Sequence, residues 1–441
     1  MLGAEQDREE RDMTSYTEMR ASELREELGS LKARYDAIVE KGLSLDMSRG
    51  KPAPAQLDLS TPMLTILSDG ADCFSEDGID CRNYGTLEGI VEARRLMACM
   101  LDDDPDTTIV LGSSSLTAMY DTIARGLDYG FLGERPWSDY DRISFICVVP
   151  GYDRHFTILD SFGIDMVCVP MLPTGPDMAM VESIVADDET VKGIWCVPKY
   201  SNPTGVTYSD ETVRRLASME CAAPDFRILW DNAYCVHDLY PRPSDQDHLL
   251  DIRKACEEAG TRDRYLKFAS TSKVTFAGGG ICAMAASEAN VAEAKARLSS
   301  QMIGGDKLSQ LRHARFLPDE DALRSHMSAL ADVIRPKFEL VEDRLADSLG
   351  DLGIARWTDP KGGYFVSFDG LDGTARRTVS LAKDAGVVLT SAGATYPHGD
   401  DPHDSNIRIA PTMPSLDELS EALDVFTCCV RIAAIEALLD R

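Results

Sequence analysis

The sequence predicts an α/β protein with a large domain, in which helices sandwich a mainly parallel sheet, and a smaller C-terminal α/β domain. Two patterns along its 441 residues indicate this fold class. From about residue 90 to 300, short apolar runs alternate with amphipathic helical patterns, as in successive βαβ units. After a mainly helical stretch from about 288 to 348, the tail returns to short strands before a last helix.

We expect three parts along the chain, because its length suits more than one domain. Residues 1–50 should form an N-terminal arm and helix that pack with the small domain. Residues 51–330 should form the large domain, and 331–441 the small C-terminal domain. Within the arm, Ser22 can cap a helix that ends near Lys41.

The individual elements follow from the same patterns. In the large domain, strands are expected at 107–111, 143–149, 164–169, 193–197, 227–230, 265–269 and 281–286, with helices at 116–127 and 156–162. In the small domain, strands are expected at 363–368, 387–390 and 406–409, and the final helix from about 415. Parallel sheets of this kind bind ligands beyond the carboxyl ends of their strands, so residues just after the strands are the first candidates for a site.

The composition argues against several classes of protein. The net charge of −29 argues against a nucleic-acid partner, whose phosphates require a basic surface. No apolar run approaches the roughly 18 residues of a membrane span, and the polar N-terminus lacks the apolar core of a signal peptide. The twelve cysteines are scattered without a Cys-x-x-Cys pair, which suits buried thiols in a reducing compartment. We therefore expect a cytoplasmic protein with no membrane partner and no metal site.

Lys273 is the leading candidate for chemistry, because it follows the expected strand 265–269 closely and precedes a run of three glycines. A lysine at the end of a buried strand loses hydration, which lowers the pKa of its ammonium and favours a nucleophilic amine. Such an amine can form a Schiff base with an aldehyde cofactor. Taken alone, the segment also fits an ordinary solvated lysine.

Two further segments after strands suit a phosphate and a flat ring. Ser113, Ser114 and Ser115 stand between a strand and a helix, where hydroxyls and free backbone N–H groups can bind phosphate. The same serines would also serve as a plain helix cap. Tyr152 follows the strand 143–149 and can stack on a ring, although a tyrosine in a loop can equally be a packing residue.

Two more segments after strands carry polar side chains that can hold a heterocycle. Asn202 lies in an Asn-Pro-x-Gly turn that aims its amide outward, where it can bind a phenolate oxygen. Asp231 follows Trp230, and a carboxylate among apolar neighbours needs a cationic partner such as a protonated pyridine nitrogen. A cap of the next helix is the alternative for Asp231. We interpret His155 as a hydrogen-bonded structural histidine.

The order of these segments along the chain is more specific than any one of them. Together they offer contacts to the phosphate, ring face, phenolate oxygen, ring nitrogen and aldehyde of one molecule, pyridoxal 5′-phosphate. Arg408, in the expected strand 406–409, has a planar guanidinium that suits the α-carboxylate of an amino acid. A surface ion pair is the alternative for Arg408 taken alone.

With these motifs, about residues 45–425 resemble the class I/II, fold type I, pyridoxal-phosphate-dependent aminotransferases. The segments Ser48–Pro52, Ser272–Gly278 and Gln310–His313 are most similar to a divergent aspartate aminotransferase subgroup. The resemblance implies that Lys273 forms the Schiff base and that Asp231 pairs with the pyridine nitrogen. It further implies Asn202 and Tyr234 at the phenolate oxygen, Tyr152 on the ring, and Ser113, Ser114 and Ser270 at the phosphate, with Ser115 and Ser272 also binding the cofactor.

On the substrate side, the resemblance implies that Arg408 binds the α-carboxylate and that Gly50 and Asn202 lie against the substrate. Lys307 is a candidate for binding a distal carboxylate, with Lys51 and Arg312 as alternatives.

Two further positions bear on the phosphate and on assembly. Tyr84 is similar to the tyrosine that reaches the phosphate of the neighbouring subunit, which implies a homodimer with shared active sites. Many members carry a phosphate-binding arginine eight residues after the lysine, where this chain has Ile281. We therefore expect hydroxyls, backbone amides, Tyr84 or another basic residue to meet the phosphate charge.

The resemblance implies a ping-pong transamination that moves an amino group from an L-amino acid, with L-aspartate as the best candidate, to 2-oxoglutarate. Another amino-acid transaminase or a pyridoxal-phosphate-dependent β-lyase remains open within the same fold, and a non-catalytic cofactor sensor remains open outside it. Lys273 and Arg408 together favour an enzyme, because a pure cofactor sensor needs no group for an α-carboxylate. No helix-turn-helix or basic domain is visible, so we expect no DNA-binding role.

Overall fold

The central sheet has eight strands in the order β2-β9-β8-β7-β6-β3-β4-β5, in a computed structural model that describes residues 15–440. The strands are β2 (Thr108–Val110), β3 (Ser144–Val149), β4 (Asp165–Leu172), β5 (Gly175–Pro176), β6 (Val191–Cys196), β7 (Arg227–Asp231), β8 (Tyr265–Ser270) and β9 (Cys282–Ala286). Neighbours run parallel from β8 through β7, β6 and β3 to β4, and pair antiparallel at β9, β2 and β5. The predicted mainly parallel sheet is confirmed.

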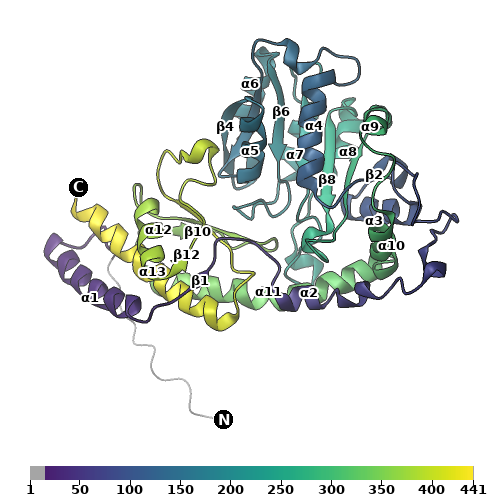
Figure 1. Cartoon of the computed structure of the whole chain (residues 1–441). Coiled ribbons are helices and arrows are strands. Elements are labelled where there is room, and N and C mark those ends of the chain that lie inside the picture. The colour runs from purple at the N-terminus through teal and green to yellow at the C-terminus, as the bar shows by residue number, and fades with distance from the viewer. Residues whose placement is uncertain (1–14, 441) are drawn as a thin grey trace.

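Alternate side chains of these strands pack on the two faces of the sheet. In β3, Phe145 and Cys147 belong to one apolar cluster, and Ile146 and Val148 belong to another. Apolar residues of three helices complete the first cluster: α4 (Ser115–Tyr129), α5 (Asp153–Ser161) and α9 (Glu288–Gln301). Those of three others complete the second: α6 (Met178–Asp187), α7 (Asp210–Ser218) and α8 (Ile252–Ala259). The sheet is thus covered on both faces, in the upper part of Figure 1, and the carboxyl ends of its parallel strands share one edge.

The C-terminal part forms a smaller α/β unit, to the lower left in Figure 1. Its antiparallel sheet contains β10 (Arg356–Trp357), β11 (Val366–Asp369) and β13 (Asn406–Ile409), and β1 (Leu45–Asp46) pairs in parallel with β12 (Val387–Val388). Helices α12 (Ala375–Asp384) and α13 (Leu416–Leu439) share its apolar core, and α1 (Ala21–Val39) lies alongside α13 (Figure 1). The N-terminal arm therefore contacts this unit through both a helix and a strand.

One strand of the smaller unit begins later than the pattern predicts. A strand was expected from 363, whereas β11 begins at Val366. Gly363 has a left-handed φ of +84°, and a Cβ built there would lie 2.9 Å from the Cβ of Tyr200. The chain passes so close to Tyr200 that it needs a glycine in this conformation, and strand pairing starts only beyond it.

Helix α11 (Glu320–Leu349) joins the two parts of the molecule (Figure 1). Its first turns share an apolar cluster with α3 (Val91–Leu101) and α10 (Lys307–Phe316), whereas from Ile334 onward its apolar residues belong to the core of the smaller unit. The short helix α2 (Pro54–Asp58) also contacts α11. The expected division between residues 330 and 331 falls inside α11, close to where the core changes, and stays a prediction.

The structure of residues 15–440 also bears on the expectations about membrane spans, cysteines and metal sites. Among residues 15–440, no helix combines the length and apolar character needed to cross a bilayer. All twelve cysteines are free thiols. Within the same residues, no group of three or more His, Cys, Asp or Glu side chains is arranged to hold a metal ion.

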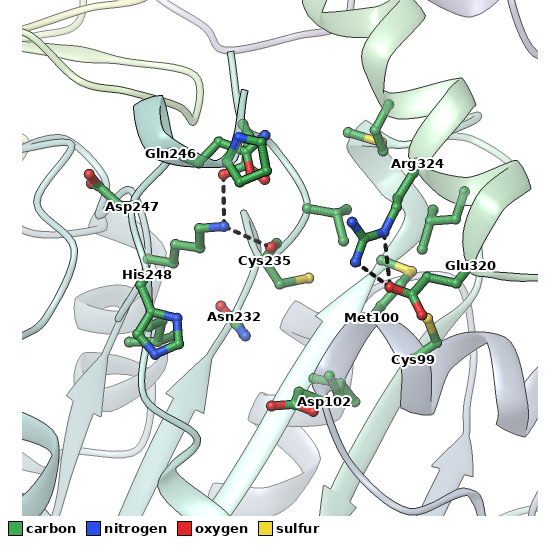
Figure 2. Close-up of a pocket in the computed structure, with 18 of the residues that line it drawn as sticks. Cys99, Met100, Asp102, Asn232, Cys235, Gln246, Asp247, His248, Glu320 and Arg324 are labelled. Atoms are coloured by element: carbon green, nitrogen blue, oxygen red, sulfur yellow. Dashed lines mark hydrogen bonds and ion pairs between the residues drawn. The ribbon is translucent and has the colours of Figure 1, made fainter. Parts of the chain in front are cut away.

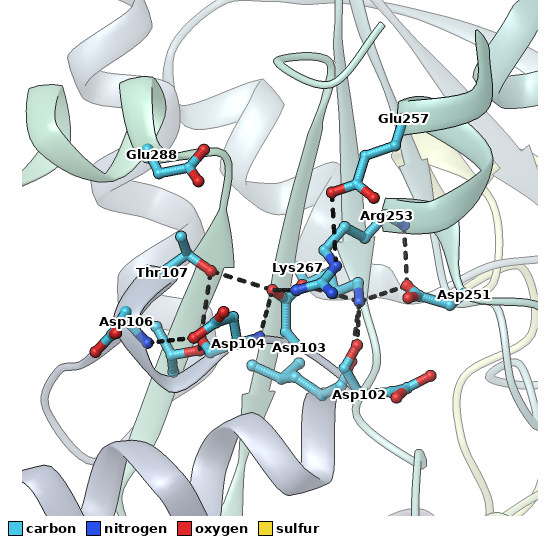
Figure 3. A network of polar contacts seen from close by, with 12 residues as sticks. Asp102, Asp103, Asp104, Asp106, Thr107, Asp251, Arg253, Glu257, Lys267 and Glu288 are labelled. Carbon is cyan, nitrogen blue, oxygen red and sulfur yellow. Dashed lines mark hydrogen bonds and ion pairs between the residues drawn. The ribbon is translucent and has the colours of Figure 1, made fainter. Parts of the chain in front are cut away.

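A buried ammonium ties three elements of the large part together. Lys267, in β8, is 1% exposed, and its Nζ donates to the carbonyl oxygens of Leu101 and Asp102 at 3.1 and 2.9 Å. It also donates to Asp251 Oδ1 at 2.7 Å (Figure 3). Asp103 Oδ2 lies 3.0 Å from the same Nζ, as an ion pair without hydrogen-bond geometry. Because Asp251 caps the N-terminus of α8, this one cation joins β8, α8 and the C-terminal end of α3.

Replacing Lys267 with Met should lower the free energy of unfolding by about 3–5 kcal/mol, because the buried Asp251 would lose its cation and Asp103 would keep only its ion pair with Arg253. Urea unfolding of the variant measures this loss. The control is Arg214→Met, which breaks an exposed ion pair with Asp210 and should change the stability little. Equal effects of the two substitutions would contradict the role given to Lys267.

Candidate active site

Lys273 lies just beyond β8, at the end of a short 3₁₀ turn (Thr271–Lys273). Its Nζ is 4.8 Å from the ring centroid of Tyr234 and 6.0 Å from that of Tyr364. Burial lowers the pKa of the Lys273 ammonium, the charge of Arg408 adds to this effect, and the Asp231 carboxylate opposes it. The three charges therefore act on one another, and the balance favours a neutral amine more than in an exposed lysine.

Asp231 is the last residue of β7 and is 3% exposed. Its Oδ2 accepts a hydrogen bond from His155 Nε2 at 2.9 Å, and the His155 ring stacks on Trp195 with 4.2 Å between centroids. The other oxygen, Oδ1, is buried and has no hydrogen-bond partner. A buried carboxylate oxygen without a donor is costly, so a bound molecule with a protonated ring nitrogen would fit here.

Tyr152 and Tyr234 lie close enough to this carboxylate for its charge to affect both phenols. Tyr152 is the N-cap residue of α5, and its ring centroid lies 5.0 Å from that of His155. Burial raises the pKa of Tyr152 to about 12, and the Asp231 charge adds to the effect. Burial also raises the pKa of Tyr234, so both phenols stay protonated near neutral pH, and Tyr234 can donate to an anionic oxygen.

The predicted phosphate residues come together from two segments. Ser270 Oγ donates to Ser272 Oγ at 3.0 Å, and Ser272 Oγ donates to the carbonyl oxygen of Ser113 at 3.5 Å. Ser114 is the N-cap residue of α4, whose first residue is Ser115. Hydroxyls gathered at the start of a 15-residue helix can bind an anion through the free N–H groups and the helix dipole.

Ile281 lies eight residues after Lys273, where the resemblance would imply a phosphate-binding arginine. Its side chain is 2% exposed and belongs to an apolar cluster that includes Ala269 and Val274. Its backbone N–H donates to Thr271 Oγ1 at 3.0 Å. The residue is thus part of the core beneath the turn that carries Lys273.

Arg408 reaches the same site from β13 of the smaller unit. It is 8% exposed, and its guanidinium lies 4.8 Å from the ring centroid of Phe365. Nη1 donates to Asn202 Oδ1 at 3.2 Å and to Asp153 Oδ1 at 3.1 Å. Nε is buried without a hydrogen-bond partner, so the guanidinium retains capacity to bind an acceptor.

Gly50 lies directly against Phe365, the aromatic ring that packs on Arg408. A Cβ built on Gly50 would lie 2.5 Å from Cζ of Phe365, so any larger residue would displace the ring. Sequence reasoning missed Phe365, Tyr364 and His155 as site residues. The only local signal for the first two was their place within the expected strand at 363–368, and His155 was predicted to be hydrogen-bonded but not to Asp231.

Comparison with known proteins identifies the family of the chain. The family described as “Aspartate amino-transferase” matches residues 19–441. The chain belongs to this family. A Corynebacterium glutamicum protein named aspartate aminotransferase is 42% identical over 407 residues, which are 92% of this chain and 93% of that protein. A Mycolicibacterium smegmatis protein, provisionally named an aminotransferase, is 49% identical over 407 residues, which are 92% of this chain and 94% of that protein.

Solved structures extend the comparison to the fold. A crystal structure of an aspartate transaminase from C. glutamicum has a TM-score of 0.93 at 41% identity, and the alignment covers 96% of this chain and 99% of that one. LysN, an α-aminoadipate aminotransferase from Thermus thermophilus, has a TM-score of 0.71 at 19% identity, over 92% of this chain and 95% of that one, and so shows the fold alone. The predicted fold type I is confirmed, and the protein is an aminotransferase of the aspartate aminotransferase type.

In this aminotransferase, Lys307 contacts the loop that carries Tyr84. Lys307 is 3% exposed, and its Nζ donates to the carbonyl oxygens of Asn83 and Gly85 at 2.6 and 2.9 Å. Tyr84, between these two carbonyls, is 82% exposed. Lys307 therefore holds the loop that presents Tyr84, while its contact to a distal carboxylate stays a prediction.

A separate cavity of about 700 Å³ lies beside the loop that follows β7, between the end of α3 and the start of α11 (Figure 2). Asn232 and Cys235 line it, together with Glu320 and Arg324 of α11. Neither Lys273 nor Arg408 lines this cavity. The candidate active site of the aminotransferase is therefore identified by the side chains at the strand ends, and not by the size of a cavity.

In the cofactor-free protein, Lys273 should react with an acylating reagent at lower pH than exposed lysines do, because burial and Arg408 lower its pKa. Asp231→Asn should shift this reaction to still lower pH, since it removes the charge that raises the pKa. Arg408→Gln should shift it to higher pH for the opposite reason. Mass spectrometry of the labelled peptide across pH measures both shifts, and one pH profile shared by all three proteins would contradict the assignment.

Proposed function

We propose that the protein binds pyridoxal 5′-phosphate and transfers the amino group of L-aspartate to 2-oxoglutarate in a ping-pong reaction. The observation that carries the cofactor is the buried Oδ1 of Asp231, which has no partner in the site that also contains Lys273. The aspartate donor is supported by the family and by the 42% identical relative named aspartate aminotransferase.

The residues of the site suit the parts of this cofactor. Asp231 would pair with the ring nitrogen while His155 keeps its carboxylate in place. Tyr152 would cover the ring, and Asn202 and Tyr234 would bind the phenolate oxygen. The serines at positions 113, 114, 115, 270 and 272 would hold the phosphate at the start of α4. When bound, the cofactor accepts the amino group and withdraws electrons from the substrate Cα.

Lys273 would act first on the cofactor and then on the substrate. Its amine would hold the aldehyde carbon until an amino acid displaces it. The Nζ set free would then serve as the base that takes the proton from the substrate Cα, since burial lowers the pKa of Lys273. Asp231 opposes the lowering, which keeps Lys273 able to return a proton afterwards.

Arg408 would bind the α-carboxylate, and Gly50 would lie against the substrate, where a larger residue would displace the Phe365 ring that packs on Arg408. A dicarboxylic substrate needs a second cation. Lys307 is the first candidate, and Lys51 and Arg312 are the alternatives. Lys307 already donates to two carbonyl oxygens, so it would need its third N–H for the substrate.

The first test is the absorption spectrum of the cofactor-loaded protein before and after L-aspartate is added without a 2-oxo acid. The band of the lysine-bound cofactor should decline, the band of the aminated cofactor should grow, and oxaloacetate should be released. Lys273→Ala should abolish this change and turnover, and full activity in that variant would refute the role of Lys273.

Other outcomes of the same test identify other activities. A response to a different amino acid alone would keep the transamination and replace the donor. Release of ammonia and pyruvate from an S-substituted cysteine would indicate a β-lyase. A bound cofactor that responds to no amino acid would favour a non-catalytic sensor.

We also propose a cytoplasmic homodimer in which Tyr84 reaches the phosphate of the partner subunit. Its support is the 82% exposure of a tyrosine on a loop held by a buried lysine. An exposed aromatic ring on a loop held in this way suits a contact with another protein surface.

Mixed dimers test the shared site. Tyr84→Ala and Lys273→Ala should each lose most activity, whereas co-refolding the two variants should restore it in about one quarter of the sites, because each mixed dimer regains one intact site. Activity of the mixture is compared with that of each variant refolded alone. No recovery in mixed dimers, isolated through a different affinity tag on each variant, would place Tyr84 outside the partner's site.

A further inference from the structure

Arg408, the predicted group for the substrate α-carboxylate, is already bound by a carboxylate of its own chain. Its Nη1 donates to Asp153 Oδ1 at 3.1 Å, and to the neutral amide oxygen of Asn202 at 3.2 Å. Asp153 comes from the first turn of α5 in the large part, and Arg408 from β13 in the smaller unit. The pair therefore crosses the site that the substrate must enter.

The two partners differ in how easily they can separate. The Arg408 side chain is 9% exposed and packs on Phe365, so it cannot regain water without moving. The Asp153 side chain is 33% exposed and lies 3.8 Å from the exposed Arg154. Asp153 can therefore turn toward solvent, where it remains hydrated and near a second cation, whereas Arg408 would be left as a buried charge.

We propose that Asp153 is a placeholder for the substrate carboxylate. It neutralises Arg408 while the site is free of substrate, and gives up Nη1 when the α-carboxylate of an amino acid or a 2-oxo acid arrives. This inference rests on the proposed function, since it takes Arg408 as the carboxylate-binding group. Every carboxylate ligand must then compete with Asp153, which weakens its apparent binding.

A purely positioning role makes the opposite prediction. If Asp153 served only to aim the guanidinium, its removal would disorder Arg408 and weaken carboxylate binding. A placeholder instead stabilises the empty site, so its removal should strengthen the binding of every ligand that presents a carboxylate to Arg408. The direction of the change in affinity therefore separates the two roles.

The test compares Asp153→Asn with the wild type, both loaded with pyridoxal phosphate. Asparagine keeps the size and can still accept from Arg408, but it has no charge. Calorimetry with succinate, a dicarboxylate without a reactive amino or oxo group, should show about 5- to 30-fold tighter binding, as expected for loss of a partly buried competing ion pair. The KM values for aspartate and 2-oxoglutarate should fall together. The melting temperature should drop without ligand, and the rise on adding succinate should be larger than in the wild type.

Two further variants serve as controls. Asp160→Asn removes a carboxylate from the same helix, where the side chain is 67% exposed, and should leave succinate binding unchanged. Asp153→Glu keeps the charge and should return the affinity toward that of the wild type. If Asp160→Asn tightened binding as much as Asp153→Asn, the effect would be one of net charge and the proposal would fail.

The outcomes also separate this inference from the proposed function. Unchanged or weaker succinate binding in Asp153→Asn overturns the placeholder, even if the wild type transaminates aspartate. Tighter succinate binding in a protein that transaminates no amino acid supports the placeholder and removes the proposed reaction. A wild type that binds no carboxylate overturns the placeholder, because Arg408 would then have no substrate group to exchange.

Discussion

The charge balance among Lys273, Asp231 and Arg408 is the interaction on which the candidate site depends. Burial and Arg408 favour a neutral amine at Lys273, and Asp231 favours the ammonium. A proton carrier in a reaction needs access to both states, which neither a fully hydrated nor an isolated buried lysine provides. Because the three residues lie on β7, on β13 and just beyond β8, this balance exists only when the large part and the smaller unit are both in place.

The parallel sheet explains why the cofactor residues occur in the same region although they are far apart in sequence. Of the neighbouring strands, β8, β6 and β3 are followed by Lys273, Asn202 and Tyr152, respectively, and β7 ends at Asp231. Parallel pairing places the carboxyl ends of these four strands at one edge, so strand order becomes the order of groups across the site. The buried Lys267, which ties β8 to α3 and α8, stabilises the strand that leads to Lys273.

Strand ends could be predicted from the sequence because apolar runs and the turns that follow them are local signals. The same signals identified Lys273, Asp231 and Asn202 as candidates, whereas Arg408 was chosen inside an expected strand for its planar guanidinium. The contacts of His155 with Asp231 and of Asp153 with Arg408 join residues 76 and 255 positions apart, so no local pattern reveals them. The late start of β11 likewise depends on a close approach to Tyr200, which only the folded chain brings about.

Lys267 and Arg408 show how a buried cation can serve either the fold or a ligand. Lys267 donates to two backbone carbonyls and a buried carboxylate, none of which can leave without breaking a helix end or cap. Arg408 has a neutral amide, an aromatic ring and one carboxylate that is partly in water. A site for an anion needs a buried cation whose partner can be exchanged. If fixed partners satisfied the whole charge, the ligand would gain no ion pair, and if no partner were present, the buried charge would destabilise the empty protein. Arg408 meets this condition because the carboxylate that balances it is the only one of its contacts that water can readily solvate.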